Sequence, residues 1–311
     1  MSAINKVFVA LLVLGLAAPL FKNIVYPVFL MNVLCFALFA SAFNLLLGFT
    51  GLLSFGHAAF FGFAAYVTGH ACKEWGLTPE LGILAGTAVA AVLGFVIGSL
   101  AIRRAGIYLA MITLAMAQLV FFVCLQAKFT GGEDGIQGIP RGRFLGLVDL
   151  TDNVSLYYFV FGVFVLGFAV IYRAIHSPFG QILKSIRENE PRAISLGYDA
   201  EKFKLVAFVL SAALSGMAGS TKSLVNQLAS LADVHWHTSG EVVLMTLLGG
   251  MGTVFGPIVG ALTVKGLEHY LAEQGSWVTI VTGAIFVVCV LAFRRGIVGE
   301  LAAVFRKSTA K

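Results

Sequence analysis

Charge is what this sequence has least of. Only 12% of its 311 residues are Asp, Glu, Lys or Arg, whereas a soluble domain carries about 25%. Hydrophobic residues make up 59%, and the mean hydropathy is +0.93. This composition leaves no room for a soluble domain beyond loops. It predicts an all-α polytopic bundle of transmembrane helices, with residues 1–311 forming a single domain.

Several functional motifs are also missing. No GxxxxGK[ST] sequence occurs, so the chain has no P-loop for nucleotide hydrolysis. No tract combines dense Lys/Arg with aromatics, so the net charge of +6 does not indicate a nucleic-acid partner. The four cysteines, Cys35, Cys72, Cys124 and Cys289, show no CxxC or metal-ligand spacing. We expect small buried hydrophobes there, and no metal or cofactor in this chain.

Acidic residues are nearly absent from the apolar runs, because Asp and Glu lie in loops or at span ends. A proton- or sodium-coupled carrier usually places ionisable groups within the bilayer, where each one is costly and therefore functional. The distribution argues against a secondary transporter, which stays open as an alternative.

The longest charge-free run extends from Asn23 to Cys72. As one helix its fifty residues would measure about 75 Å, far more than the roughly 30 Å hydrocarbon core. It must cross twice, with a break where glycine and small polar residues gather. The break is either a tight turn at the membrane edge or a broken helix at a transport site. The residues assigned to this pathway or hinge are Asn44, Gly48, Gly51, Ser54, Gly56 and His57.

A second glycine break repeats part of the first. Leu46-Leu-Gly-Phe-Thr-Gly51 is followed by a Phe-Gly step, as is Leu247-Leu-Gly-Gly-Met-Gly252. Glycine-interrupted segments at corresponding places in two halves point to a transporter binding site. Gly249, Gly250 and Gly252 therefore join the pathway or hinge set. Chance similarity between two Gly/Leu-rich segments is the alternative for this weak internal repeat.

About ten spans are predicted, and eight are possible if a glycine-broken pair only re-enters the membrane. With the N-terminus inside, fourteen of the 21 Lys and Arg residues face the cytoplasm, and so do both termini. Lys6 and the small pair Ala17-Ala18 also leave open a removed secretory signal. The predicted spans are Val7–Leu20, Ile24–Gly48, Leu52–Ala71, Leu81–Ile102, Ile107–Ala127, Val154–Tyr172, Leu205–Leu224, Val242–Gly249, Val254–Leu267 and Trp277–Phe293.

The same count places the loop at residues 128–153 outside, and the basic segment 173–204 and the tail 294–311 in the cytoplasm. Within the basic segment, Ser177-Pro178 predicts an N-cap followed by Pro at N1. Asn189 or Glu190 would cap a second short helix that Gly197 closes. Two short, capped, charged helices indicate a surface that docks a partner. An amphipathic segment resting on lipid headgroups is the alternative.

His57 supports two interpretations, a hydrogen-bond donor in helix packing or a group lining the pathway. Ser54 lies three residues earlier, on the same face of a helix, which leaves an intramembrane Ser/His protease as a third class. That class is weakly supported, because no GxSG nucleophile turn is present and helical neighbours alone do not set a base against a serine.

Five stretches resemble the LivM-type permease family of branched-chain amino acid ABC importers, in order along nearly the whole chain. They are NLLLGFTGLLSFGHAAFFGFAAYVTG (44–69), RRAGIYLAMITLAMAQLVF (103–121), FTGGEDGI (129–136), SPFGQILKSIRENEPRAISLGYDAEKFKLVAFVLSAALSGMAG (177–219) and EVVLMTLLGGMGTVFGPIVGA (241–261). The resemblance implies a multi-pass protein of the bacterial cytoplasmic (inner) membrane, and not an enzyme. Its implied partners are a second permease of the LivH type, two cytoplasmic ATPases that bind ATP and Mg, and an extracytoplasmic solute-binding protein.

Two docking elements are expected, the first of them implied by the resemblance. The one that couples the permease to an ATPase comprises Ile186, Arg187, Glu188, Asn189, Glu190, Pro191, Arg192, Ala193, Leu196 and Gly197. The one expected to face the binding protein is the outer loop with Thr130, Gly131, Gly132, Glu133 and Asp134. The expected solutes are branched-chain amino acids, other small amino acids or carboxylates. The family also includes importers of urea, amides and aromatic acids, so these solutes are the alternatives.

Overall fold

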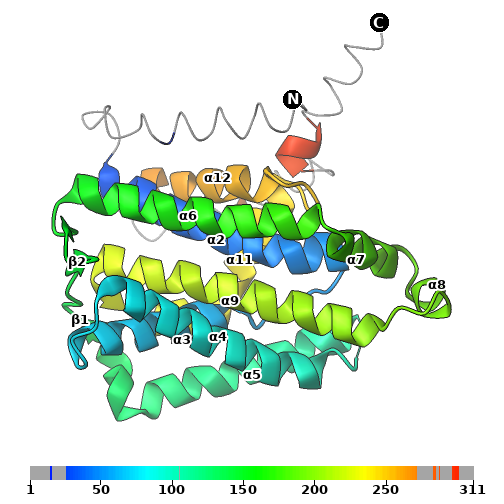
Figure 1. Ribbon diagram of the computed structural model, residues 1–311, viewed down its shortest axis with the longest axis horizontal. Helices are drawn as coiled ribbons and strands as arrows, with labels where there is room; N and C mark the ends of the chain where they lie inside the picture. The colour runs from blue at the N-terminus through cyan, green and yellow to red at the C-terminus, as the bar shows by residue number, and fades with distance from the viewer. Residues whose placement is uncertain are drawn as a thin grey trace, which may run out of the picture.

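The helices of the chain run side by side along one long axis, with the strands at one end and two short helices at the other (Figure 1). This computed structural model describes residue 15 and residues 26–104, 106–271, 283–284, 287 and 296–300. The predicted spans Val7–Leu20 and Trp277–Phe293 and most of the tail 294–311 lie outside these residues.

Within the described residues, five helices are long and apolar enough to cross a membrane. They begin and end within five residues of the predicted spans, because the polar and Gly/Pro boundaries of each apolar run also end the helix. These helices are α2 (Pro27–Thr50), α4 (Pro79–Ala101), α5 (Ile107–Gln126), α6 (Asn153–Ile175) and α9 (Ala200–Asn226).

Three shorter helices flank the two predicted breaks. α3 (His57–Lys73) follows α2 after a non-helical stretch, and α11 (Trp236–Gly249) is separated in the same way from α12 (Gly256–Leu271). They contain 17, 14 and 16 residues, so each is shorter than a full span. The break predicted between Gly48 and Gly56 is confirmed and falls after Thr50.

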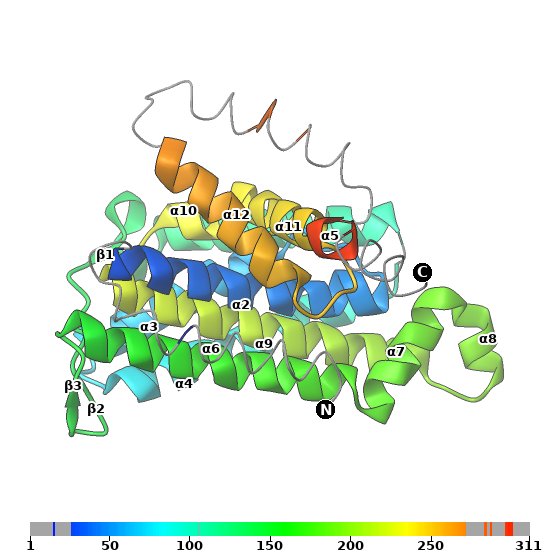
Figure 2. The ribbon, with the colours of Figure 1, turned by 90° about the horizontal axis from the view of Figure 1, so that it is seen from above.

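Short elements occupy the two ends of the bundle. α7 (Pro178–Glu188) and α8 (Glu190–Ser195) project at one end (Figures 1 and 2). At the other end two small antiparallel pairs form, β1 with β4 and β2 with β3. The remaining short elements are η2 (Lys128–Thr130), η3 (Gly132–Asp134), β1 (Ile136–Gln137), β2 (Arg143–Phe144), β3 (Val148–Asp149), β4 (Leu228–Ala229) and α10 (Leu231–Val234).

α9 packs directly against α2, α3 and α4, and small residues let the backbones approach. A Cβ atom at Gly219 would lie 1.9 Å from the Phe61 carbonyl oxygen, and one at Gly216 would lie 2.2 Å from Ala90 Cβ. Membrane helices associate through such small-residue faces, because lipid supplies no hydrophobic force between them. α4 and α5 instead expose large apolar side chains such as Phe95 and Met111, as expected of helices that contact lipid.

Candidate functional site

The two glycine breaks contact each other. Asn44 Oδ1 accepts a hydrogen bond from the Gly252 backbone N–H at 2.9 Å, and Asn44 Nδ2 donates to the Thr253 carbonyl at 2.8 Å. A Cβ atom at Gly48 would lie 2.6 Å from the Gly252 nitrogen, so only glycine permits this approach. The structure therefore brings three pathway candidates from both halves of the chain, Asn44, Gly48 and Gly252, to one place.

Arg187, near the end of the projecting helix α7, contacts the residues where the two glycine breaks meet. Its Nη1 donates to the Gly48 carbonyl oxygen. Its Cγ would lie 3.1 Å from a Cβ at Gly51, and its Nη1 3.3 Å from one at Gly252. Gly51 and Gly252 both have a φ of +77°, which strongly favours glycine. One side chain thus joins the predicted coupling helix to both breaks.

The ends of α7 and α8 were largely predictable. The Asn189 side chain accepts from the Arg192 N–H, which settles the choice of cap for α8 in favour of Asn189. Gly197 follows the helix at φ +92°, as predicted. Ser177 holds the N-cap position of α7, but its hydroxyl donates to the Ala174 carbonyl at 2.7 Å instead of capping α7. The predicted N-cap position and the Pro that follows it are confirmed, although the Ser177 hydroxyl bonds the end of α6 and makes no capping hydrogen bond.

Beneath these helices lies a small apolar cluster of Ile186, Ala193 and Ala200. The Lys204 ammonium, 7% exposed, pairs with the Glu190 carboxylate at 2.5 Å and so fastens α8 to α9. The other docking candidates face outward, and Leu196 is 68% exposed. The exposed members are Arg187, Glu188, Asn189, Pro191, Arg192, Leu196 and Gly197.

A second ion pair in this segment is open to solvent. Lys202 Nζ lies 2.8 Å from the Asp199 carboxylate, which also accepts from the Lys202 N–H at the start of α9. Hydrogen bonds from the side chain and backbone of Lys202 hold the pKa of Asp199 below its ordinary value.

His57 and Ser54 are fully buried in the interior of the bundle. Its Nδ1 lies 3.1 Å from Ser54 Oγ, and its Nε2 lies 2.9 Å from Ser211 Oγ on α9. Ser54 and His57 have no exposed surface. Gly56 is buried beside Thr113 of α5. This geometry favours helix packing over pathway lining, and it gives a protease substrate no access to Ser54.

The outer-loop candidates lie at the end opposite α7 and α8. The Thr130 hydroxyl is buried and lies within hydrogen-bonding distance of the Cys124 and Ala127 carbonyls, at 2.5 and 2.6 Å. Gly131 and Gly132 have positive φ and turn the chain. Glu133 and Asp134 are exposed, so among the five candidates these two acids present charge to a partner.

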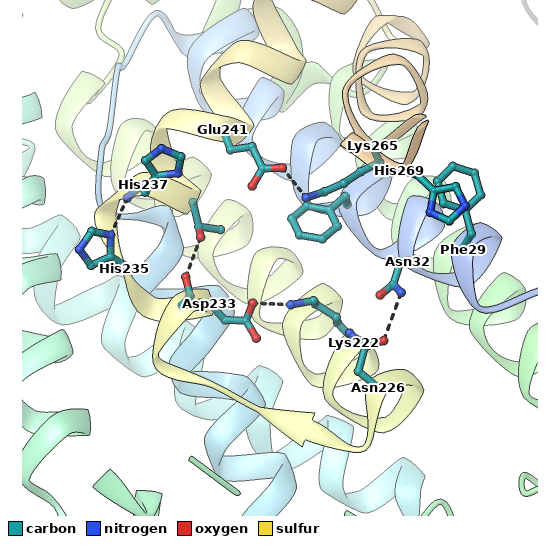
Figure 3. Close-up of a pocket in the computed structure, with 13 residues that line it drawn as sticks. Phe29, Asn32, Lys222, Asn226, Asp233, His235, His237, Glu241, Lys265 and His269 are labelled. Carbon is teal, nitrogen blue, oxygen red and sulfur yellow. Dashed lines mark hydrogen bonds and ion pairs between the residues drawn. The ribbon is translucent and has the colours of Figure 1, made fainter. Parts of the chain in front are cut away.

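A polar pocket of about 560 Å³ opens near the same end (Figure 3). Four of its residues form two ion pairs, Lys222 with Asp233 and Lys265 with Glu241, and each side chain is at most 16% exposed. The pocket is lined by Phe29, Asn32, Phe36, Lys222, Asn226, Ala232, Asp233, His235, His237, Thr238, Glu241, Lys265 and His269.

None of these residues was among the predicted site residues. Glu241 directly precedes the predicted span Val242–Gly249, and the structure places it within α11 with its side chain 15% exposed against Lys265 of α12. In the sequence, the positions of Glu241 and Lys265 at the edges of apolar segments were the signal that could have indicated the pocket.

Within the described residues, no group of three His, Cys, Asp or Glu side chains is placed to hold a metal ion. Cys35, Cys72 and Cys124 are buried and free, and Cys289 lies outside the described residues.

A family described as the permease component of the branched-chain amino acid transport system matches residues 27–290. The LivM permease of the high-affinity branched-chain amino acid transport system of Escherichia coli K12 is 27% identical, over 92% of this chain and 73% of that protein. Its Salmonella typhimurium counterpart is 28% identical, over 80% of this chain and 64% of that protein.

A probable LivM permease of Methanocaldococcus jannaschii is 29% identical over 56% of this chain and 52% of that protein. No solved structure matches significantly. The family match covers most of the chain, including both glycine breaks, α7, α8 and the pocket. The chain therefore belongs to the branched-chain amino acid permease family and is a multi-pass membrane protein of LivM type.

Proposed function

We propose that this chain is a permease subunit of an ATP-driven importer for branched-chain or other small amino acids. It forms the translocation pathway with a second, LivH-type permease in the bacterial inner membrane. Two cytoplasmic ATPases supply ATP hydrolysis, and a solute-binding protein delivers the solute from outside. Family membership supports this role, as does the missing P-loop, which requires any nucleotide hydrolysis to take place on another subunit.

The proposed topology has about ten spans, with both termini in the cytoplasm. The positive-inside rule puts α7 and α8 on the cytoplasmic side, because segment 173–204 carries a large share of the Lys and Arg residues. The loop at 128–153 then faces outward with the pocket. The positions of these elements at opposite ends of the bundle are consistent with this arrangement (Figure 1).

The observation that carries the proposal is the contact of Arg187 with both glycine breaks. α8 and the end of α7 form the ATPase docking surface. A displacement of α7 on ATP binding moves Arg187, and with it the hydrogen bond to Gly48 and the contacts at Gly51 and Gly252. These glycines are the hinge positions, since they adopt backbone conformations that other residues resist. The pathway thereby opens outward, and hydrolysis resets it.

Reconstitution tests this function. The chain is purified with the second permease, ATPase and binding protein encoded nearest to it, and placed in proteoliposomes. We expect uptake of labelled L-leucine that requires internal ATP, stops with vanadate and persists with a protonophore. Uptake abolished by the protonophore at constant ATP would indicate a secondary transporter instead.

Competition by unlabelled solutes distinguishes the alternative substrates. Urea, acetamide and benzoate should leave leucine uptake unchanged, whereas isoleucine and valine should reduce it. Deleting residues 188–197 should abolish ATPase stimulation by the loaded binding protein in a complex that still assembles. Stimulation that survives the deletion would remove the coupling role of α8.

A further inference from the structure

The polar pocket has two charged walls. One is formed by Lys222 of α9 and Asp233 of α10, and the other by Glu241 of α11 and Lys265 of α12. Figure 3 shows the two pairs on opposite sides of the pocket. Burying an ion pair costs more desolvation than a well-packed apolar pair of similar volume, so two such pairs are poorly explained by stability. Ionisable groups in membrane-embedded protein usually mark a solute path.

The two walls differ in their balance of charge. Among the described residues, Lys222 has one carboxylate partner, Asp233, whereas Lys265 has two, Glu241 and Glu268. The α11–α12 wall is thus richer in acceptors and suits a cationic group. Lys222 has three N–H donors and one acid, so it suits an anionic group on the α9 wall. Asn32 Oδ1, also buried at the pocket, has no hydrogen-bond donor among the described residues and can accept from the same cation.

Apolar surface lies between the charges. The Phe36 ring centroid is 3.8 Å from Lys265 Nζ and 5.6 Å from Lys222 Nζ, so the ring is flanked by both ammonium groups. Phe29 stacks on His269 at a centroid distance of 4.7 Å and extends the aromatic surface. The volume of about 560 Å³ lies within the range of small-molecule sites. A small solute with both charges and an apolar side chain fits this combination.

We infer that the pocket is a binding site of the permease itself for a zwitterionic α-amino acid with an apolar side chain. The solute ammonium pairs with the Glu241 wall and its carboxylate with Lys222, while the side chain lies against Phe36. The site receives the solute after release from the binding protein. This inference rests on the proposed function but assigns selectivity to this chain as well as to the binding protein.

A binding assay without the binding protein tests it on the unaltered sequence. The complex of permeases and ATPases is placed in nanodiscs, and labelled L-leucine binding is measured by scintillation proximity. Leucinamide lacks the carboxylate and 4-methylpentanoate lacks the ammonium. We expect each to compete at least about tenfold more weakly than leucine, since each loses a charge-assisted hydrogen bond. Equal competition by either analogue, or no leucine binding, would overturn the inference.

Two double variants test the walls. E241Q/K265M and K222M/D233N each remove both members of a buried pair, so neither member is left as an uncompensated charge. Glu268 also loses Lys265 in the first variant, but its side chain is 37% exposed and water can solvate it. Each variant should weaken leucine binding at least about tenfold, in complexes that assemble with the same subunit stoichiometry as the unaltered complex. The matched control is D199N/K202M, which removes the exposed pair at the opposite end and should leave leucine binding unchanged. Unchanged binding in both wall variants would make the ion pairs structural only.

Uptake separates this inference from the proposed function. If the complete system takes up leucine with ATP while the wall variants keep the unaltered KM, the pocket assignment fails and the importer function stands. If the complete, unaltered system takes up no leucine, the proposed function fails.

Discussion

Asn44 holds the backbone of Gly252 by hydrogen bonding although the two residues lie 208 positions apart. The amide uses both of its ends, since it also donates to the Thr253 carbonyl at 2.8 Å. An amide is well suited to this role because it offers a donor and an acceptor on one rigid group. The second break is therefore held against α2 by one side chain.

Asn44→Ala should destabilise the protein by roughly 1–3 kcal/mol, because a part-buried backbone N–H and carbonyl both lose their partner. Thermal unfolding of the purified permease in mild detergent measures this. Asn153→Ala is the control, since its side chain accepts from Arg141 at the surface, and it should change stability by no more than about 0.5 kcal/mol. Equal effects of the two variants would show that the Asn44 contact contributes nothing specific.

Gly51→Ala should impair transport beyond its effect on stability. The left-handed conformation costs alanine roughly 1–2 kcal/mol, and the new Cβ would also meet Arg187 Cγ at 3.1 Å. Gly76→Ala is a matched control, because Gly76 has a φ of +64° with no atom within 4 Å of its Cβ position. Leucine uptake per assembled complex should fall for Gly51→Ala only. A similar fall in both variants would assign the effect to backbone strain alone.

Arg187→Lys should uncouple ATP hydrolysis from transport. Lysine keeps the charge but loses the planar fork that reaches Gly48. Losing one charge-assisted hydrogen bond corresponds to about tenfold less leucine imported per ATP hydrolysed. Both rates are measured in the same proteoliposomes. Arg173→Gln, at an exposed position on α6 at the same end, serves as control and should leave the ratio unchanged.

His57→Leu should destabilise the permease by about 1–3 kcal/mol, because Ser54 and Ser211 lose their contacts with the ring. The unfolding midpoint in detergent measures the change. The folded protein should also fail to react with a fluorophosphonate probe at Ser54, which has no exposed surface. Labelling that mass spectrometry places on Ser54, and that is lost in Ser54→Ala, would revive the protease alternative.

Most of the described helices were predictable because their boundaries are local. A charge-free run must break within the length of a bilayer, and Gly51 marks where α2 stops. The caps of α8 follow from Asn189 and Gly197 in the same way. The hydrogen bond of the Ser177 side chain could not be predicted locally. Its hydroxyl donates to the Ala174 carbonyl at the end of α6, which is not part of the capping motif.

The pocket was not predictable, because its ion pairs join different helices. Lys222 meets Asp233, and Lys265 meets Glu241, only after α10, α11 and α12 have packed beside α9 and α2. In the sequence these residues lie at the edges of apolar segments, where charge normally faces water. The contact of Arg187 with Gly48, 139 positions away, was hidden for the same reason.

The close fit of α9 has a consequence for how the protein can move. With no space for a methyl group at Gly216 or Gly219, α9 cannot slide past α3 or α4 without a backbone collision. Those helices must move as one rigid body, so the freedom needed for alternating access falls to the α11–α12 hairpin and to α7. A spin-label pair within the α3, α4 and α9 group should keep one distance through the ATP cycle, whereas a pair from α9 to α12 should sample two.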